Sequence, residues 1–276
     1  MRFHLSLLFV YLLVCDISAQ TNRFIYNLSR QAGGATRDFK MVLDVNPDEV
    51  KFYDYRFIEI DSANKKNPDK EIRTTSFSQQ VLKRKRNSHQ HISYFANSDL
   101  NYFSIASDDP IEWKLSDELR ELDGYTLQKA SADFRGRHWV AWFSPDVPIS
   151  EGPYKFCGLP GLIFEVEDSE KHYVYKLVSN TQLRETADTS NFLETFYGDN
   201  PIAINWKKYE KLMLDEYNDP FNRLAKSLRE GKSIRIGSEE ITSTSQLDAR
   251  RRSYQETIKK YYNPIERDKL INYPSK

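Results

Sequence analysis

Hydrophobic and polar residues alternate along the early part of the chain with a period of two, which is the spacing of side chains on one face of a β-strand. The alternating segments are 23–28, 38–45, 50–55 and 57–60. Between them, Gly33-Gly34 and Asn46-Pro47-Asp48 are residues that favour turns. The pattern therefore predicts a meander of antiparallel strands. We expect the polar residues 61–70 to form an exposed loop after it.

The same alternation predicts two β-hairpins in the middle of the chain. The first joins 125–133 to 137–143 around Gly136, and the second joins 162–167 to 172–179. Both faces of the segment 137–143 are apolar, which favours a strand inside the sheet rather than at its edge.

Shorter segments between these regions give weaker signals. Residues 75–85 have no clear period and are compatible with a short helix. Three further strands and one turn are predicted, the strands at 92–96, 102–106 and 111–115 and the turn at 116–119.

The stretch 152–168 is the most constrained part of the sequence. Three of the chain's ten glycines lie within ten residues here, and prolines lie between them. Because glycine permits close backbone approach and proline fixes φ, the chain must follow a tight path before it enters a strand at Leu162. The residues that define this structural motif are Gly152, Pro153, Phe156, Gly158, Leu159, Pro160, Gly161, Leu162 and Ile163.

The last third of the chain has helical rather than strand spacing. Phe221, Leu224, Ala225 and Leu228 lie at i, i+3, i+4 and i+7, and Gly231 is a natural stop. Residues 246–262 predict a charged terminal helix. The chain is therefore expected to have an α+β fold with a mainly antiparallel sheet and with helices concentrated toward the C-terminus. We expect a β-rich domain over 20–200 and a helical, irregular appendage over 201–276.

The N-terminus predicts export. A basic start, an apolar run over 5–14 and the small residues before position 20 are the parts of a secretory signal peptide, which we place at 1–19. Cys15 raises the alternative of a lipoprotein anchor, but Val14 fits poorly immediately before a lipidated cysteine. No later stretch is long and apolar enough to span a bilayer, so no transmembrane segment is expected in the mature chain.

Charge and composition narrow the class of partner. The chain has 40 basic and 40 acidic residues, and this zero net charge gives no long-range attraction to nucleic acid. The basic run 83–86 is open to two interpretations, a patch for anionic lipid or polysaccharide and a solvated edge. His89 and His91 have strand spacing, but no third ligand is placed beside them, so we predict no metal and no cofactor.

Cys157 is the only cysteine that remains after removal of 1–19, so an internal disulfide is not expected. A nucleophilic Cys157 would need a base, for which His138 and His172 are the candidates. Lone cysteines are more often small buried hydrophobes. Glu165 and Glu167 could be proposed for acid–base chemistry, but charges on the polar face of a strand are usually solvated.

The hexapeptide Gly158-Leu159-Pro160-Gly161-Leu162-Ile163 resembles the signature of the GLPGLI family of exported proteins from certain Gram-negative bacteria. Matching surroundings extend the resemblance over most of the mature chain, namely Trp113, Tyr125, 128–130, Ala141-Trp142, Pro148, Gly152-Pro153, Phe156 and the tail 263–266. The resemblance implies a secreted or periplasmic protein whose role is unestablished. It also implies a curved sheet similar to that of lipoprotein-sorting carriers. Members often carry a cysteine where Leu127 stands here.

Three functions remain open from the sequence. The first is non-enzymatic binding of an apolar or amphipathic ligand, such as a lipid or peptide, or of a protein partner, in the concavity of the sheet. The motif turn would then form the lip of the concavity, whose candidate lining residues are Trp139, Trp142, Phe156 and Phe164; the alternative is that these aromatics are simply core. The second is an accessory component of an outer-membrane transport or secretion assembly. The third is an enzyme that uses Cys157.

Overall fold

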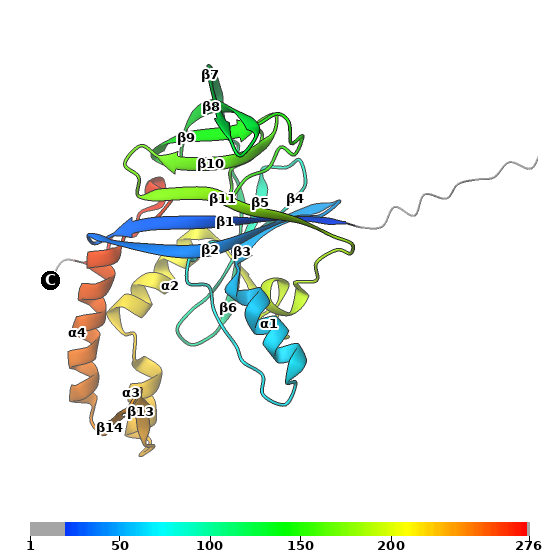
Figure 1. Ribbon diagram of the computed structural model, residues 1–276. Coiled ribbons are helices and arrows are strands. Elements are labelled where there is room, and N and C mark those ends of the chain that lie inside the picture. The colour runs from blue at the N-terminus through cyan, green and yellow to red at the C-terminus, as the bar shows by residue number, and fades with distance from the viewer. Residues whose placement is uncertain (1–19, 275–276) are drawn as a thin grey trace, which may run out of the picture.

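The computed structural model describes residues 20–274, so the predicted signal peptide at 1–19 lies outside the described residues. Twelve strands form one sheet with the order β12-β6-β5-β4-β3-β2-β1-β11-β10-β9-β8-β7 (Figure 1). All neighbouring pairs are antiparallel except β12 and β6, which are parallel. The fold is thus the expected α+β arrangement, with a mainly antiparallel sheet.

The strands of this sheet are β1 (Thr21–Ala32), β2 (Ala35–Val45), β3 (Glu49–Asp54), β4 (Val81–Lys85), β5 (Gln90–Ala96), β6 (Tyr102–Asp108), β7 (Lys114–Leu122), β8 (Tyr125–Phe134), β9 (Arg137–Ser144), β10 (Leu162–Asp168), β11 (Tyr173–Leu183) and β12 (Ile202–Ile204). The α-helices are α1 (Arg56–Lys66), α2 (Trp206–Asn218), α3 (Asn222–Arg229) and α4 (Thr244–Tyr261). A small separate hairpin pairs β13 (Ile234–Ile236) with β14 (Glu239–Ile241), and single turns of helix lie at Ser190–Glu194 and Arg267–Lys269.

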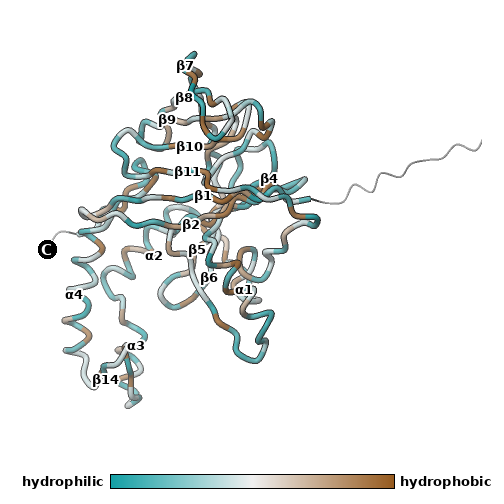
Figure 2. Tube along the Cα trace, viewed as in Figure 1, coloured by the Kyte–Doolittle hydropathy of each residue, from teal (hydrophilic) through white to brown (hydrophobic). Residues whose placement is uncertain are grey.

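Strands β1 to β3 are central because their side chains are buried on both faces. Tyr26, Met41 and Phe52 point to one face and join a large core with β8 to β11, which we call the motif-side core. Ile25, Val42 and Tyr53 are neighbours of those residues in sequence and point to the other face. There they pack against Phe57 of α1 and against Phe192 and Phe196, which we call the α1-side core. Figure 2 shows the hydrophobic segments gathered around these central strands.

Four local predictions are wrong. Residues 57–60 lie in α1 rather than in a strand, because Phe57 alone turns inward and stacks on Phe192, with ring centroids 5.5 Å apart. The same helix continues through much of the expected loop 61–70. Residues 75–80 form an irregular segment that leads into β4, so 75–85 contains no helix. Residues 116–119 lie inside β7, where the pairing with β8 shifts between Leu115 and Leu119.

Both predicted hairpins are confirmed. β8 and β9 pair around Gly136, and β10 and β11 pair around a turn at 169–172. β9 lies between β8 and β10, as its two apolar faces indicated. The stripe of Phe221, Leu224, Ala225 and Leu228 packs against the buried side chains of β13, β14 and α4. Within 20–274, no helix is both long and apolar enough to cross a membrane.

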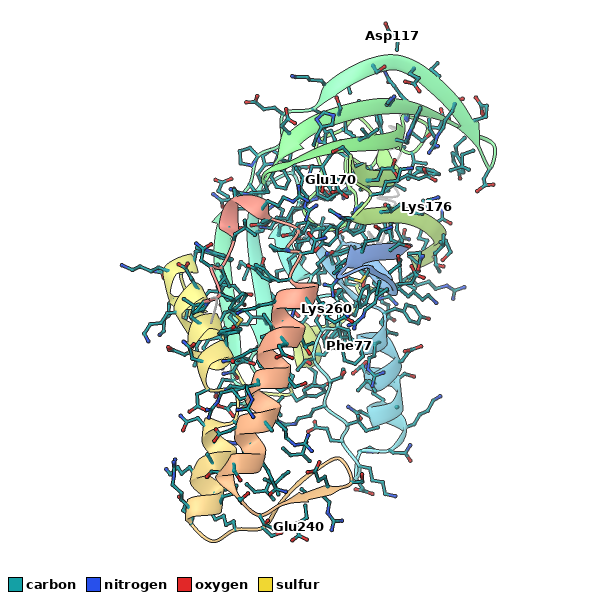
Figure 3. The ribbon with its side chains drawn as sticks, turned by 90° about the vertical axis from the view of Figure 1, so that its left-hand side faces the viewer. Phe77, Asp117, Glu170, Lys176, Glu240 and Lys260 are labelled. Atoms are coloured by element: carbon teal, nitrogen blue, oxygen red, sulfur yellow. The ribbon has the colours of Figure 1, made fainter. Side chains whose placement is uncertain are left out.

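Helices α2 to α4 and the β13–β14 hairpin extend away from the sheet, and Figure 3 shows Glu240 of that hairpin at the opposite end of the molecule from Asp117 of β7. The residues after 200 nevertheless contribute to the sheet, because β12 pairs with β6. The tail after α4 also returns to it. The buried Arg137 of β9 donates hydrogen bonds to the carbonyl oxygens of Pro264 and Ile265, at 2.7 and 3.0 Å, and to the side chain of Asn263.

Candidate functional site

The motif occupies a long connection, residues 145–161, between β9 and β10, which we call the motif loop. It folds back on the start of β10 through backbone hydrogen bonds. The amide of Leu162 donates to the carbonyl of Val147 at 3.0 Å, and that of Ile163 donates to the carbonyl of Glu151 at 3.0 Å. Tyr26 of β1 also holds the start of β10 in place, because its hydroxyl donates a hydrogen bond to the carbonyl of Ile163 at 2.6 Å. The loop therefore has one specified path, as the glycines and prolines predicted.

The glycines of the motif serve two different purposes. Gly158 has a φ of +93° and is exposed, so its conformation is the reason for glycine there. At Gly161 close approach decides, because an added Cβ would lie 2.1 Å from the carbonyl oxygen of Ser144. Close approach also explains Gly152, because an added Cβ there would lie 2.7 Å from Cδ1 of Ile163.

Phe156 inserts from the motif loop into the centre of the motif-side core. Its ring centroid is 4.5 Å from that of Trp139 and 6.0 Å from that of Tyr175, and its side chain is 1% exposed. Trp139 and Phe164 are also buried in this core, whereas Trp142 is half-buried beneath the Arg120 guanidinium. The four predicted lining residues thus do not surround an open space. Residues of the motif loop are themselves part of this core.

A cluster of buried charges ties the motif loop to strands β4 to β6. Arg84 of β4 pairs with Glu151, and Lys155 pairs with Asp109 at 2.7 Å and with Glu266 of the tail at 2.5 Å. Burial raises the pKa of Asp109, but the charge of Lys155 and its hydrogen bonds outweigh burial and hold the pKa below its usual range. The same competition between burial and Lys155 leaves the pKa of Glu266 lowered. Both carboxylates are therefore ionised counterions of Lys155.

His91 of β5 belongs to this cluster and has an unusual environment. Its side chain is 1% exposed, and neither ring nitrogen has a hydrogen-bond partner among the described residues. Burial, together with the charge of Lys155, lowers the pKa of His91 to about 3. The imidazole is consequently neutral over the physiological range of pH.

Cys157 lies at the edge of the same cluster. Its Sγ is 3.9 Å from Nδ1 of His89, and its carbonyl accepts a hydrogen bond from Nε1 of Trp113 at 2.9 Å. The thiol is buried and free, and burial raises its pKa even though Arg84 acts in the opposite direction. This environment suits a packed side chain better than a thiolate nucleophile.

The bases that the sequence suggested for Cys157 lie elsewhere. His138 Nδ1 is 2.8 Å from a carboxylate oxygen of Asp133, and His172 Nδ1 is 2.9 Å from one of Glu170. The proposed pairing of Cys157 with either histidine is therefore wrong. The histidine that does approach the thiol, His89, carries no sequence signal for this role, because it lies 68 residues from Cys157 and just before β5.

Asp168, Glu170 and His172 place ligand-type atoms within 4.8 Å of one another. Arginines already neutralise this group. Arg137 Nη1 is 2.7 Å from Asp168 Oδ2, and Arg267 Nη1 is 2.9 Å from Glu170 Oε1. Hydrogen bonds from Arg267 lower the pKa of Glu170 to about 2. Two adjacent guanidinium groups oppose the binding of a cation. Of the other predicted acidic pair, Glu165 pairs with Arg120 at 2.5 Å.

A cleft of about 920 Å³ lies on the face of the sheet opposite the motif loop. We call it the open cleft. It lies over β3 to β6, and its lining residues are Asp48, Glu49, Lys83, Arg84, Lys85, Gln90, His91, Ile92, Ala106, Ser107 and Asp108. Ile92 and Ala106 are exposed and sit opposite each other on β5 and β6. Charged and polar side chains surround this small apolar floor.

Strand alternation divides the residues of the basic run between the two faces. Arg84 and His91 are paired across β4 and β5 and point to the motif loop, where Arg84 meets Glu151. Lys83 points to the other face and lies 3.7 Å from Glu194, a residue of the α1 side. The run 83–86 is thus neither a uniform patch nor a simple solvated edge. Strand alternation in the sequence is enough to assign neighbouring residues of the run to opposite faces. It does not indicate that Glu151 and Glu194 are the acidic partners on those faces.

Comparisons with known proteins agree with this picture of the motif. The family model described as "Protein of unknown function (Porph_ging)" matches residues 134–165, which contain the end of β8, β9 and the motif loop. The match is consistent with the GLPGLI resemblance of the hexapeptide. The comparison with curated proteins found no match.

Among solved structures, the chain is similar to one titled "Structure of PNGF-II in C2 space group", with a TM-score of 0.50 and 16% sequence identity over 71% of this chain and 33% of that chain. The structure of PNGF-II in the P21 space group gives a TM-score of 0.49 at 16% identity, over 70% of this chain and 33% of that one. The chain therefore spans about a third of the length of these structures. At this identity the likeness concerns the fold alone.

Proposed function

We propose that the protein is exported and binds an amphipathic ligand without chemical turnover, and that its ligand occupies the open cleft over β3 to β6. The observation that carries this proposal is the contrast between the two faces of the sheet. The motif side is filled by the motif loop, whereas the cleft of about 920 Å³ stays accessible. This volume is in the range of about 300–1,000 Å³ that small-molecule sites occupy.

The side chains of the cleft suit a ligand with both apolar and polar parts. Ile92 and Ala106 form an apolar floor, and Gln90 lies beside them at the rim. Lys85 and Asp108 are exposed and make no ion pair among the described residues, so their charges are available to a ligand. Orientation by a few polar groups around an apolar contact is the usual form of such sites.

The absence of turnover is proposed from the state of the most reactive side chain. Cys157 is 4% exposed, and it is not among the residues that line the open cleft. Export is proposed from the predicted signal peptide and from the resemblance to exported proteins, with the periplasm, the outer-membrane surface and the exterior as possible destinations.

Native mass spectrometry of protein purified from its own envelope tests the proposal. We expect a co-purifying small molecule or peptide in the wild type. Ile92→Trp fills the floor of the cleft, so this variant should lose the bound mass. Val178→Trp is the matched control, because Val178 is 58% exposed on β11 and lies outside the cleft. Retention of the bound mass by Ile92→Trp would refute the cleft as the site.

A second candidate function, an accessory component of an outer-membrane transport or secretion assembly, is favoured by the outermost strand. Leu115 and Leu119 of β7 are 54% and 61% exposed, and no described strand pairs with the outer edge of β7. Cross-linking in intact cells, with photoreactive residues at these two positions, should then capture one outer-membrane partner. A photoreactive residue at Val178 serves as the control and should not capture it.

A further inference from the structure

The start of β1 has a sharp boundary between an exposed residue and a buried one. Gln20 is exposed, whereas the side chain of the next residue, Thr21, is 0% exposed. The Thr21 hydroxyl donates a hydrogen bond to Oδ1 of Asn46 at 2.5 Å and accepts one from the amide of Ala187 at 2.9 Å. The chain is therefore held inside the sheet from Thr21 onward, and Gln20 lies outside it in contact with solvent.

The side chain of Gln20 is nevertheless positioned by the sheet. Its carbonyl oxygen, Oε1, accepts a hydrogen bond from Nε2 of Gln182 on β11 at 2.5 Å. The two glutamines share one face, because Asn22, two residues after Gln20, is the strand partner of Gln182. The register of β1 and β11 thus directs an N–H donor at the side-chain carbonyl of Gln20.

Cleavage after Ala19, which the proposed export requires, would give Gln20 a free α-amino group. An α-amino group titrates near neutral pH, so part of it is uncharged and nucleophilic. Its nitrogen can attack Cδ of the same residue, because the product is an unstrained five-membered lactam and no second molecule has to be brought in. The bond from the α-nitrogen to Cδ forms, the Cδ–Nε2 bond breaks, and a proton of the α-nitrogen leaves with Nε2 as ammonia.

The contact with Gln182 is placed where this reaction needs a hydrogen-bond donor. When the α-nitrogen adds to Cδ, negative charge develops on Oε1, which is the atom that Gln182 contacts. A donor that is already directed at such an oxygen stabilises the charged intermediate more than the uncharged amide. The folded chain should therefore cyclise faster than an N-terminal glutamine without this neighbour.

We infer that Gln20 becomes pyroglutamate in the mature chain, and that Gln182 promotes the cyclisation by donating a hydrogen bond to Oε1. This inference goes beyond the binding of a ligand, but it rests on the export that belongs to the proposed function. The modified chain has neither a free amino group nor a positive charge at its N-terminus.

Peptide mapping by mass spectrometry of protein purified from its own envelope tests the modification. We expect an N-terminal peptide that begins at Gln20 and is lighter by one ammonia than its sequence requires. Gln20→Asn is the matched variant, because it keeps the amide but has a shorter side chain that would have to close a smaller, strained ring. The N-terminal peptide of this variant should have the full mass of its sequence.

The role of Gln182 is tested by cyclisation rates of purified protein, from which a fusion partner is removed immediately before Gln20. Gln182→Met has a side chain of similar length without an N–H donor. It should lose ammonia about threefold to tenfold more slowly than the wild type, since one hydrogen bond to the developing charge is missing. Thr181→Ala is the control and should keep the wild-type rate, because Thr181 lies beside Gln182 on β11 but on the opposite face.

Rates in concentrated urea separate the contact from other effects of the substitution. The unfolded wild type and unfolded Gln182→Met should cyclise equally fast, because the sheet no longer holds residues 20 and 182 together. Equal rates of the two folded proteins, or a difference that persists in urea, would overturn the role of Gln182. Urea unfolding midpoints equal to that of the wild type establish that the variants are folded.

The failure of this inference differs from the failure of the proposed function. A mature chain that begins at Gln20 with its full mass, or that begins at another residue after position 19, would refute the modification and leave export intact. A chain that retains 1–19 would refute export and the modification together. None of these results depends on the open cleft, whose occupancy is tested separately by native mass spectrometry of Ile92→Trp.

Discussion

The two faces of the sheet are built from alternate residues of the same strands, yet one face is covered by the motif loop and the other stays partly open. On the motif side, the chain's own loop inserts Phe156 among the aromatics and brings Glu151 and Lys155 to charges on the strands. On the other face, α1 and the segment 189–199 cover β1 to β3 but leave the ends of β4 to β6 open. The comparison shows that the most constrained stretch of the sequence closes one face. The site proposed for a ligand, the open cleft, lies on the face that the motif loop does not cover.

The largest expected difference between the faces concerns the ring of Phe156. Phe156→Ala should lower the free energy of unfolding by about 3–5 kcal/mol, because it leaves a cavity in a core that has no other side chain to fill it. Ile92→Ala on the open face should cost less than about 1 kcal/mol, since Ile92 is 37% exposed. Urea unfolding measures both. Similar losses for the two variants would mean that the motif loop does not complete the motif-side core.

A slightly smaller loss is expected at Gly161. Gly161→Ala should cost about 3 kcal/mol, because the new Cβ meets the Ser144 carbonyl oxygen and the backbone must move. Gly34→Ala is the matched control. Gly34 has a φ of +77° with no atom near its added Cβ, so this variant isolates the conformational cost of about 1–2 kcal/mol. Thermal or urea unfolding that ranks Gly34→Ala as the worse variant would contradict the close approach.

The buried charges provide the next test. Lys155→Met should lower the free energy of unfolding by about 2 kcal/mol or more, because Asp109 and Glu266 stay buried with one partner fewer. Lys85→Met, on the open face, should change it by less than about 0.5 kcal/mol. Urea titrations at neutral pH distinguish the two, and a neutral effect of Lys155→Met would show that the cluster does not hold the loop.

The smallest predicted effect is a dependence on pH that comes from His91. Its folded pKa of about 3 lies below the ordinary value of 6.5, so the unfolded chain binds more protons between these values. Stability should therefore fall by about 1 kcal/mol per pH unit as the pH drops below 6.5. Lys155, Asp109, Arg84 and His89 are the charged and titratable groups that act on His91.

The window from pH 6.5 to 5 isolates this contribution. The stability provided by Asp109 and Glu266, whose pKa values are lowered from 3.8 and 4.5, is fully present there and is lost only at lower pH. Unfolding free energies of His91→Phe should have a flatter slope in this window than the wild type. His138→Gln, at an exposed position, should keep the wild-type slope. An unchanged slope in His91→Phe would contradict the neutral, buried imidazole.

Local features of the fold could be predicted because their causes are local. The hairpin around Gly136 follows from alternation on both sides of a turn residue, and the helix over 222–229 follows from four apolar residues at helical spacing. Residues 57–60 misled the prediction because four residues fit strand and helix equally well. Only the contact of Phe57 with Phe192, 135 positions later in the chain, decides in favour of α1.

By itself the sequence determined the antiparallel sheet, both central hairpins, the C-terminal helices and the tight path of the motif loop, since alternation, turn residues and glycine–proline spacing act over a few residues. Only the tertiary structure decided what the loop does and which charges meet. Arg84 and Glu151, or Lys155 and Glu266, are ordinary charged residues in the sequence. Alternation assigns a side chain to a face of its strand, but the distant segment that covers that face is selected by burial in the folded chain.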